Sequence, residues 1–488
     1  MSRIVERIDS LFNPQSIAFI GASKKPGKWG FIIFLHLLMS SYNGKVYPVN
    51  PNEKEVLGVP SYPSLDDIPY DVDLAYVTIP QDKVIDIMQE CIKKGVKAVI
   101  LIAAGFGEIA EENKELEKEI ASIAERGNLV VMGPNCNGIV SASCGLCALM
   151  PAFFPKKGHI AVVSQSGNIG NSILVRGMEH NIGFSRYISS GNESHLCSED
   201  YIEYYGEDDE TKVITAYIEG IKDGRKFFEV AKRVTKKKPI ILLKGGTTAF
   251  GASAAKSHTG SMAGSAEVFA SMCRQAGIIG VNNLDEMFDI ASSFLCQPLP
   301  KGNNVGIVTG GGGWGVVVSD ACAREGLNLP DLEPETISAL DQILPSWWNK
   351  GNPIDTVAGQ NRAAFIDAME ILIKSDYIDS AIGLGIGFSA MTGDAYSTSK
   401  FRSQFKELDM PGHSASQDLK TAEKIIKLKN EYKKPILLAT DAAVMAKSHE
   451  HSVFKMYEDE GIIVFPTPDR ATRVLAKLTH YKNYLQDS

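Results

Sequence analysis

His159-Ile-Ala-Val-Val-Ser-Gln-Ser-Gly-Asn168 is the segment that decides the fold of this chain. An apolar stretch of strand length runs into a turn of small residues, and a helix-like stretch follows. The pattern occurs twice more, in Ser16-Ile-Ala-Phe-Ile-Gly-Ala-Ser23 and in Asn304-Val-Gly-Ile-Val-Thr-Gly-Gly-Gly-Gly-Trp-Gly315. The three copies begin at nearly equal intervals, so they indicate three similar α/β modules.

The length of the chain agrees with three modules. Its 488 residues suggest roughly three domains, at about 150 residues each. The stretches 151–158 and 297–303 each carry two prolines and a glycine, which break regular structure and are typical of linkers. We therefore expect three domains, covering residues 1–156, 157–300 and 301–488.

Within the modules, apolar stretches of strand length alternate with helix-like stretches. The expected strands are Lys45–Val49, Leu74–Ile79, Ala98–Ile102, Leu129–Met132, Val213–Ile218, Ile240–Leu243, Ala381–Ile386, Pro435–Ala439 and Ile462–Phe465. The expected helices include Asp82–Lys94, Glu108–Glu125, Arg225–Lys236 and Pro468–Leu485. This alternation predicts an α/β protein with doubly wound parallel sheets, in which ligands bind beyond the carboxyl ends of the strands.

Composition and charge exclude several classes of partner. The net charge is −8, and the longest basic run is Lys236-Lys237-Lys238, so nucleic acid is not an expected partner. The apolar run Phe31–Met39 is too short to cross a bilayer. The first twelve residues lack the apolar core of a signal peptide. We expect a cytoplasmic protein that does not bind membranes.

The eight cysteines are too few and too scattered for a disulfide framework. Cys144-Gly-Leu-Cys147 is a CxxC motif, but a structural zinc site needs a second pair of ligands and none follows. Reduced thiols and no bound metal are therefore expected.

The turns between strand and helix are candidate anion sites. Backbone N–H groups point outward at a helix N-terminus, where the helix dipole adds about half a positive charge. The first turn carries Gly21, Gly27 and Gly30, which is not GxGxxG and is only a moderate nucleotide signal. A NAD site also needs a carboxylate after the second strand, where this chain has Asn50. The alternative is a turn whose glycines serve packing alone.

The second and third turns carry a stronger indication of phosphate. The second contains Ser164, Gln165, Ser166, Gly167 and Asn168, which offer hydroxyls and small residues at a helix start. The third contains Gly310, Gly311, Gly312 and Gly313. Four consecutive glycines cost backbone entropy on folding, and a purely structural turn seldom needs such a run. Both predict binding of phosphate or another anion; the alternative is a tight crossover.

Two side chains suggest chemistry at these turns. His258 lies among small residues ahead of a helix-like stretch, so its imidazole can approach a phosphate and act as a nucleophile. Glu219 ends an apolar strand, where its carboxylate could accept the second N–H of His258. Taken singly, an ordinary loop histidine and an exposed loop glutamate are the simpler interpretations.

Seven motifs, in order along the chain, resemble the NDP-forming acyl-CoA synthetases, and most closely the α subunits of ADP-forming acetate–CoA ligases, which are related to succinyl-CoA synthetase. They are Ile20-Gly-Ala-Ser23 with Pro26-Gly27, Tyr47-Pro-Val-Asn-Pro51, Ala104-Gly-Phe-Gly-Glu108, Gly133-Pro-Asn-Cys-Asn-Gly138, Ser164-Gln-Ser-Gly167, Ser257-His-Thr-Gly260 and Gly351-Asn-Pro-Ile-Asp355. The resemblance implies a Rossmann-like CoA-binding domain followed by two flavodoxin-like ligase domains.

The resemblance also implies a reaction. The family interconverts acyl-CoA, phosphate and ADP with the acid, CoA and ATP, through an acyl phosphate and a phosphohistidine. The phosphorylated position here is His258, supported by Glu219, with the second and third turns flanking the phosphoryl group. The implied contacts to CoA are Gly21, Ala22, Ser23, Asn50, Pro51, Pro80, Gly105 and Asn135.

The sequence departs from the family in three respects, one of which is Lys28-Trp29 in the first turn, where smaller residues are common in the family. No ATP-grasp segment follows the third module, so the resemblance implies that ADP or ATP, with Mg²⁺, binds a partner β subunit in a hetero-oligomer. Asn52 stands where many relatives carry a lysine, and Lys24, Lys25 or Lys54 could replace that charge.

The alternative functions are a non-catalytic sensor of CoA or acyl-CoA and, less favoured because of Asn50, a nicotinamide-dependent oxidoreductase. The acyl group is open.

Overall fold

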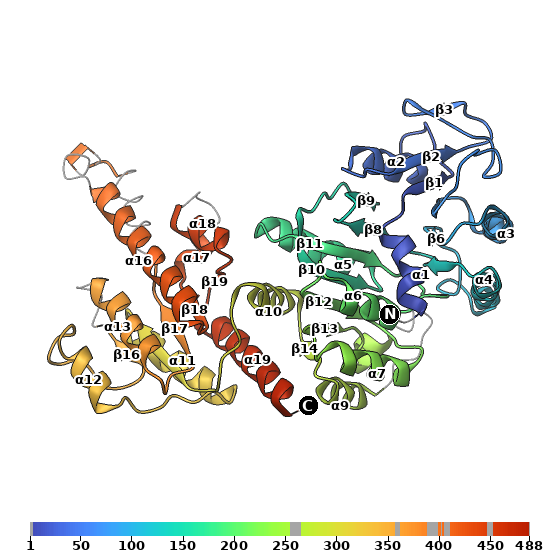
Figure 1. The fold of residues 1–488 in the computed structure, drawn as a ribbon. Helices are drawn as coiled ribbons and strands as arrows, with labels where there is room; N and C mark the ends of the chain where they lie inside the picture. Colours follow the sequence, from blue (N-terminus) through green and yellow to red (C-terminus); the bar gives the residue numbers. More distant parts are fainter. Residues whose placement is uncertain are drawn as a thin grey trace. The chain divides into compact units, whose positions relative to one another are not determined.

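The computed structural model describes residues 3–253, 265–356, 362–387, 399–401, 403–404, 410–446 and 452–487. They divide into two compact units, Met1–Ala291 and Ser292–Ser488 (Figure 1). His258, the predicted phosphoryl acceptor, lies outside the described residues. Within the described ranges, no helix has the length and apolarity that crossing a bilayer requires.

The first sheet has five parallel strands, which fall in the blue-to-cyan part of the chain in Figure 1. In sheet order they are β2 (Lys45–Val49), β1 (Ser16–Ile20), β5 (Leu74–Val77), β6 (Ala98–Leu101) and β7 (Val130–Met132). The helical segments of this module are α1 (Arg3–Phe12), α2 (Trp29–Met39), η1 (Gln81–Lys83), α3 (Val84–Lys94), η2 (Glu111–Asn113) and α4 (Lys114–Arg126). A short hairpin joins β3 (Glu55–Val56) to β4 (Val59–Pro60). Nearly every strand residue is buried, because helices cover the sheet and leave no polar face.

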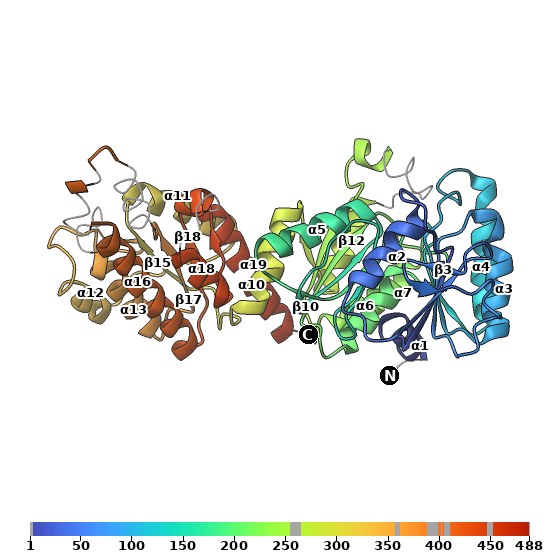
Figure 2. The same cartoon turned by 90° about the horizontal axis from the view of Figure 1, so that it is seen from above.

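The second sheet has a parallel core and an antiparallel edge. Its strands, in sheet order, are β14 (Ile279–Val281), β13 (Ile240–Lys244), β12 (Val213–Ile218), β10 (Lys157–Ser164), β11 (Phe184–Ser189), β8 (Gly138–Ser141) and β9 (Leu146–Leu149). Its helices are α5 (Gly167–Glu179), α6 (Ser198–Glu207), α7 (Gly224–Val234), α9 (Ala266–Gln275) and α10 (Leu284–Cys296). Helix α5 lies on one face of this sheet, and α6 and α7 lie on the other (Figure 2).

The β8–β9 hairpin, which the sequence analysis did not anticipate, ties the first two modules together. It pairs antiparallel with β11. Tyr76 of the first sheet donates a hydrogen bond to the Ala148 carbonyl at 2.9 Å, and the His36 ring hydrogen-bonds the Leu149 carbonyl at 2.9 Å. One hydrophobic core contains buried side chains of both sheets. This shared core explains why the two modules form one compact unit.

The third sheet, in the second unit, again has five parallel strands. In sheet order they are β16 (Ile354–Asp355), β15 (Val305–Thr309), β17 (Ser380–Leu384), β18 (Ile436–Ala439) and β19 (Val464–Phe465). The described helices of this unit are α11 (Gly312–Arg324), α12 (Pro334–Leu340), α13 (Arg362–Lys374), α16 (Met410–Tyr432), α17 (Ala442–Ala446), α18 (Ser452–Asp459) and α19 (Pro468–Asp487).

The parallel strands of all three sheets share one order, in which the second strand along the chain lies beside the first and the third lies on its other side. The three switch points, where the direction of winding reverses, lie between β1 and β5, β10 and β12, and β15 and β17. The predicted α/β class with doubly wound parallel sheets is confirmed. The domain boundaries at 156 and 300 stay predictions.

Candidate active site

The eight residues predicted to contact CoA all follow strands of the first sheet. Gly21, Ala22 and Ser23 follow β1, Asn50 and Pro51 follow β2, Pro80 follows β5, Gly105 follows β6 and Asn135 follows β7. Because the strands are parallel, their carboxyl ends share one edge of the sheet, where doubly wound folds bind ligands. The structure thus brings these eight positions to one edge; their contact with CoA stays a prediction.

The turn after β1 depends on close backbone approach. Gly21 has a φ of +90°, in the left-handed region that favours glycine. A Cβ atom on Gly30 would lie 2.0 Å from the Gly21 carbonyl oxygen, so α2 can begin here only without a side chain. The Asn50 amide donates to the Ala22 carbonyl at 2.7 Å and accepts from the Asn52 N–H at 2.8 Å. Asn50 therefore joins the turns after β1 and β2.

One lysine near this edge is paired within the chain. Lys24, one of three residues predicted to replace a charge at Asn52, forms an ion pair with Glu53 at 3.1 Å. Both side chains are partly exposed, so water screens their attraction. Lys24 can therefore exchange Glu53 for an anion at little cost.

Glu108 organises the loop after β6, a role that the sequence analysis missed. Its carboxylate accepts from the Gly105 N–H at 2.6 Å and from the Phe106 N–H at 3.1 Å. The Asn192 amide donates to the same carboxylate at 2.5 Å, and the Asn135 amide donates to the Asn192 oxygen at 3.2 Å. Glu108 belongs to a motif quoted for the resemblance, but nothing in the sequence indicated its partners.

The turn Ser164–Asn168 lies at the carboxyl end of β10 and starts α5. Ser164 donates its hydroxyl proton to the Ser166 carbonyl at 2.6 Å, and Ser166 caps the helix by accepting from the Ile169 N–H at 3.5 Å. A Cβ on Gly167 would meet the Asn137 side chain at 2.7 Å, so packing alone explains this glycine. The turn has the predicted form of a helix N-terminus beside a switch point, where N–H groups can face an anion.

Glu219 lies directly beside this turn, because β10 and β12 are neighbours. The Gln165 side-chain oxygen accepts from the Glu219 N–H at 2.6 Å and from the Gly220 N–H at 3.0 Å. Glu219 is only 8% exposed, so it is not the exposed loop glutamate of the alternative interpretation. Burial, and then the Glu219 carboxylate to which its hydroxyl is hydrogen-bonded, raise the pKa of Tyr217 to about 12.

Lys244 holds the other side of Glu219. Its ammonium group donates to the Glu219 carbonyl at 2.7 Å. Burial lowers the pKa of Lys244, and the Glu219 carboxylate opposes that shift. The structure therefore brings Gln165 and Glu219 together and adds Tyr217 and Lys244, which the sequence analysis did not single out.

The turn Gly310–Gly313 starts α11 beside the switch point of the third sheet. Gly310 donates its N–H to the Leu384 carbonyl at 3.2 Å. Among the described residues, no heavy atom lies within 4 Å of a Cβ built on Gly311 or Gly313, so packing does not account for these two glycines. A cavity of about 340 Å³ adjoins the turn, lined by the four glycines, Trp314 and Gly385. The turn belongs to the second unit, whereas Ser164–Asn168 belongs to the first.

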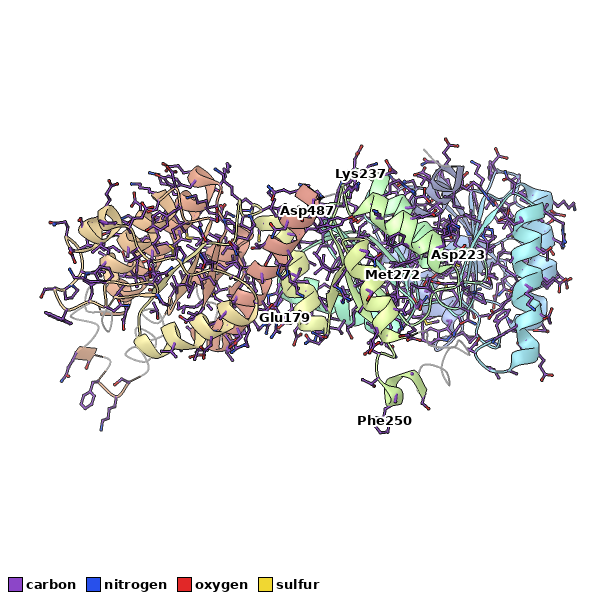
Figure 3. The ribbon with its side chains drawn as sticks, turned by 90° about the horizontal axis from the view of Figure 1, so that it is seen from below. Glu179, Asp223, Lys237, Phe250, Met272 and Asp487 are labelled. Carbon is purple, nitrogen blue, oxygen red and sulfur yellow. The ribbon has the colours of Figure 1, made fainter. Side chains whose placement is uncertain are left out.

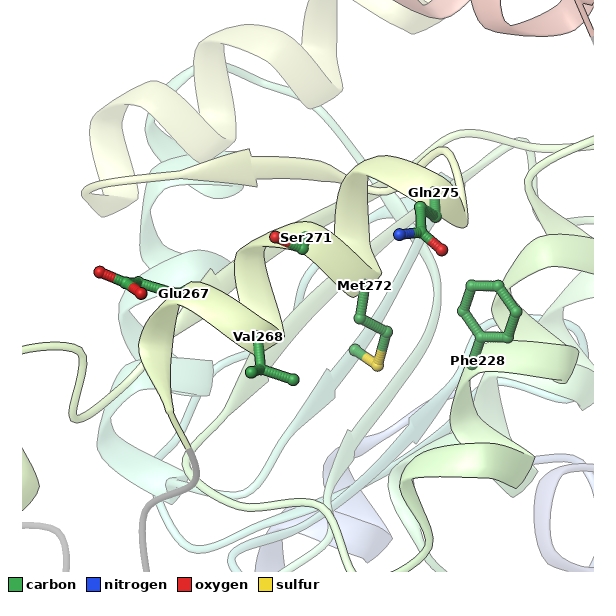
Figure 4. A pocket seen from close by; sticks show the side chains of 6 residues that line it. All are labelled: Phe228, Glu267, Val268, Ser271, Met272 and Gln275. Atoms are coloured by element: carbon green, nitrogen blue, oxygen red, sulfur yellow. The ribbon is translucent and has the colours of Figure 1, made fainter.

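Two further features of the first unit involve residues that precede or follow residues 254–264 in the sequence. Phe250, in the helical segment 249–253 after β13, is 92% exposed and projects from the ribbon (Figure 3). A hollow of about 510 Å³ lies on α9 and α7, lined by Phe228, Glu267, Val268, Ser271, Met272 and Gln275. Figure 4 shows Met272 pointing toward the Phe228 ring. The hollow is mainly apolar and was not predicted.

Family models match most of the chain. Residues 15–142 match the CoA binding domain, residues 157–294 match the succinyl-CoA ligase like flavodoxin domain, and residues 305–397 match the ligase-CoA domain. The order of the three matches is the order expected from the sequence.

Curated relatives cover the chain at substantial identity. The α subunit of ADP-forming acetate–CoA ligase II of Pyrococcus furiosus is 44% identical over 79% of this chain and 84% of its own length. The α subunit of ligase I of the same organism is 35% identical over 98% of both chains. This chain spans about half the length of two other relatives, from Methanocaldococcus jannaschii and Archaeoglobus fulgidus.

A solved structure has the same fold. It is the acetyl-coenzyme A synthetase 1 of Ca. Korarchaeum cryptofilum in complex with phosphate and ADP, which is 31% identical, with a TM-score of 0.85 over 98% of this chain and 97% of that one. Together with the domain matches and the curated relatives, this similarity places the protein: the chain belongs to the family of ADP-forming acetate–CoA ligases.

Proposed function

We propose that this chain is the α subunit of an ADP-forming acid–CoA ligase, which interconverts acyl-CoA, phosphate and ADP with the acid, CoA and ATP. The observation that carries the proposal is the pairing of Glu219 with the helix-starting turn Ser164–Asn168 at the switch point of the second sheet. A buried carboxylate beside a helix N-terminus can orient an imidazole while the helix dipole stabilises a phosphoryl group.

The proposed chemistry has three steps. Phosphate attacks the thioester carbonyl, which forms an acyl phosphate and releases the thiolate of CoA. The neutral imidazole of His258 then attacks phosphorus, the P–O bond to the acyl group breaks, and the acid leaves. Finally ADP takes the phosphoryl group from His258 and becomes ATP. Glu219 accepts the other ring N–H of His258, which orients the ring and stabilises its positive charge.

The remaining predicted residues take binding roles in this proposal. The turns Ser164–Asn168 and Gly310–Gly313 bind phosphate or the phosphoryl group in turn. The exposure of Gly312 and Gly313 at the start of α11 supports that role for the second turn. The eight positions at the edge of the first sheet bind CoA.

The nucleotide, with Mg²⁺, is proposed to bind a separate ATP-grasp β subunit. Two relatives are named α subunits. This chain spans only about half the length of two other relatives, so each of those proteins has a further region that this chain does not match. The eight cysteines are all free thiols, which favours a reducing compartment and therefore the cytoplasm. The absence of a metal in this chain stays a prediction.

The test is reconstitution with an ATP-grasp β chain encoded beside this one. The pair is given acetyl-CoA, phosphate and ADP, and both the CoA thiol and ATP are measured. We expect thiol and ATP to appear in equal amounts, and a panel of acids in the reverse direction then identifies the acyl group. Tight CoA binding without any turnover would contradict the proposal and favour the non-catalytic sensor.

A further inference from the structure

Glu193 is a buried carboxylate that the proposed reaction does not use. It lies in the bend after β11 and is only 3% exposed. Its φ is +54°, in the left-handed region, which costs a residue with a side chain about 1–2 kcal/mol. Burial raises the pKa of this carboxyl group, and its hydrogen bonds oppose that shift. A buried carboxylate on a strained backbone needs stabilising contacts. The partners in those contacts indicate the role of Glu193.

The carboxylate of Glu193 accepts three hydrogen bonds from side chains. Ser198 donates at 2.5 Å and Ser190 at 2.7 Å, both to the same oxygen. The other oxygen accepts from Nε2 of Gln165 at 3.0 Å. Lys222 donates to the backbone carbonyl of Glu193 at 2.6 Å, which fixes the bend itself. The side chain is therefore held on one side by two serines and holds Gln165 on the other.

These partners leave one orientation for the Gln165 amide. Its nitrogen faces the Glu193 carboxylate and, at 2.8 Å, the Gly220 carbonyl, both of which only accept. Its oxygen faces the backbone N–H groups of Glu219 and Gly220, which only donate. The backbone N–H of Gln165 donates to the Tyr217 carbonyl at 3.1 Å. All donors of Gln165 are thus engaged, and its oxygen fixes the backbone of Glu219.

We propose that Gln165 and Glu193 are positioning residues, which hold the backbone of Glu219 so that its carboxylate meets the phosphoryl-accepting histidine in the required place. The proposal rests on the proposed function. Lys244 holds the Glu219 carbonyl and Gln165 holds its N–H, so the residue is fixed from both sides. The side chains of Gln165 and Glu193 do not touch the reacting atoms in this account and act through Glu219, whereas the turn Ser164–Asn168 binds phosphate through its backbone.

The experiment uses the complete complex with the β chain and measures the rate at which labelled ATP phosphorylates His258. Gln165→Leu and Glu193→Ala each remove the contact, and Glu193→Gln is the conservative variant. In Glu193→Gln, the new amide oxygen still accepts from Gln165, and its nitrogen donates to the serine hydroxyls. Glu229→Gln, at an exposed ion pair on α7, is the matched control. The affinity for CoA is measured in parallel by calorimetry.

We expect Gln165→Leu and Glu193→Ala to slow phosphorylation by about tenfold to a hundredfold, the range seen when partners that orient a functional side chain are removed. CoA affinity stays within twofold, Glu193→Gln recovers most of the rate, and Glu229→Gln keeps all of it. If Glu193→Ala does not fold, the phosphorylation rate of Gln165→Leu tests the inference. Wild-type rates in the folded variants would overturn the inference alone, whereas an unlabelled wild-type complex would overturn the proposed function.

Discussion

At the scale of single residues, close backbone approaches shape the edge of the first sheet. Gly30 permits α2 to start against the turn after β1, because any side chain there would run into the Gly21 carbonyl. Gly27, in the same turn, has the opposite requirement. Its φ is +85°, but among the described residues no heavy atom lies within 4 Å of a Cβ built on it. Substitution of Gly30 therefore tests steric fit, whereas substitution of Gly27 tests backbone strain alone.

Gly30→Ala is expected to weaken CoA binding at least tenfold, because the backbone of the turn must move to admit the methyl group. Gly27→Ala is expected to cost about 1–2 kcal/mol of stability through its left-handed backbone, with a much smaller effect on CoA. Calorimetric titration with CoA and thermal unfolding of both variants measure this difference. Equal losses of affinity in the two variants would contradict the assignment of the CoA site to this turn.

At the scale of elements, the start of α11 shows a glycine pattern that packing does not explain. Gly313 is exposed, lies in the first turn of the helix and has room for a methyl group among the described residues. Gly224 is similarly open at the start of α7, where the Asp223 side chain already accepts from the first N–H groups and no anion site is proposed. Gly313 and Gly224 therefore both have room for a methyl group, but only Gly313 lies in a turn proposed to bind an anion.

Gly313→Ala is therefore expected to stabilise the chain by about 0.5–1 kcal/mol, as alanine does in helices, yet to slow phosphoryl transfer because the methyl group blocks the approach of the anion. Gly224→Ala should give the same gain in stability at an unchanged rate. Thermal unfolding and the rate of ATP formation test both. A Gly313→Ala enzyme with the wild-type rate would remove the argument for an anion site at this turn.

Helix α6 carries a buried carboxylate that makes stability depend on pH. Glu199 is 3% exposed, and burial, together with the carboxylates of Asp200 and Glu193, raises its pKa from about 4.5 to about 7. The folded chain therefore holds this proton more tightly than the unfolded chain does. The resulting stabilisation is complete below pH 4.5 and is lost as the pH rises toward 7.

Glu199→Gln, which stays neutral, should therefore gain stability over the wild type as the pH rises. The expected difference is small at pH 4.5 and grows to roughly 3 kcal/mol by pH 8, at about 1.4 kcal/mol per pKa unit. Urea unfolding of both proteins across this pH range measures it. A difference that does not change with pH would show that Glu199 titrates normally.

The elements also show what the sequence could and could not predict. Strand β12 was predicted at its observed bounds, Val213–Ile218, because a continuous apolar run between polar segments has few alternatives. The helix expected from Glu108 begins only at Lys114, because the Glu108 carboxylate binds the N–H groups of its own loop. The short β8–β9 hairpin was missed, although Gly145 offered a turn between its strands.

The candidate site divides in the same way. Strand order makes the neighbourhood of Glu219 and the Ser164–Asn168 turn predictable, because residues after adjacent parallel strands meet at one edge. Glu193 was not predictable, since a glutamate in a polar bend has the pattern of an exposed residue. Its role depends on side chains distant in the sequence, which only the folded chain brings together.

At the scale of the whole molecule, the bend after β11 connects two predicted sites within the first unit. Asn192 turns toward Glu108 and Glu117, at the CoA edge, while the neighbouring Glu193 turns toward Gln165 and the phosphate turn. Lys222 donates to the carbonyls of both, which makes the bend a single rigid connection. The three sheets repeat one strand order, and each carries its glycine-containing turn at its own switch point.

The most direct test of the account is to locate the phosphoryl group. The complex with the β chain is incubated with Mg²⁺ and γ-labelled ATP, and the acid-labile label is mapped by peptide sequencing at alkaline pH. The account predicts one labelled peptide that contains His258, with no label in His258→Asn and transfer of the label to added ADP. Label on another residue, or label that persists in His258→Asn, would contradict it.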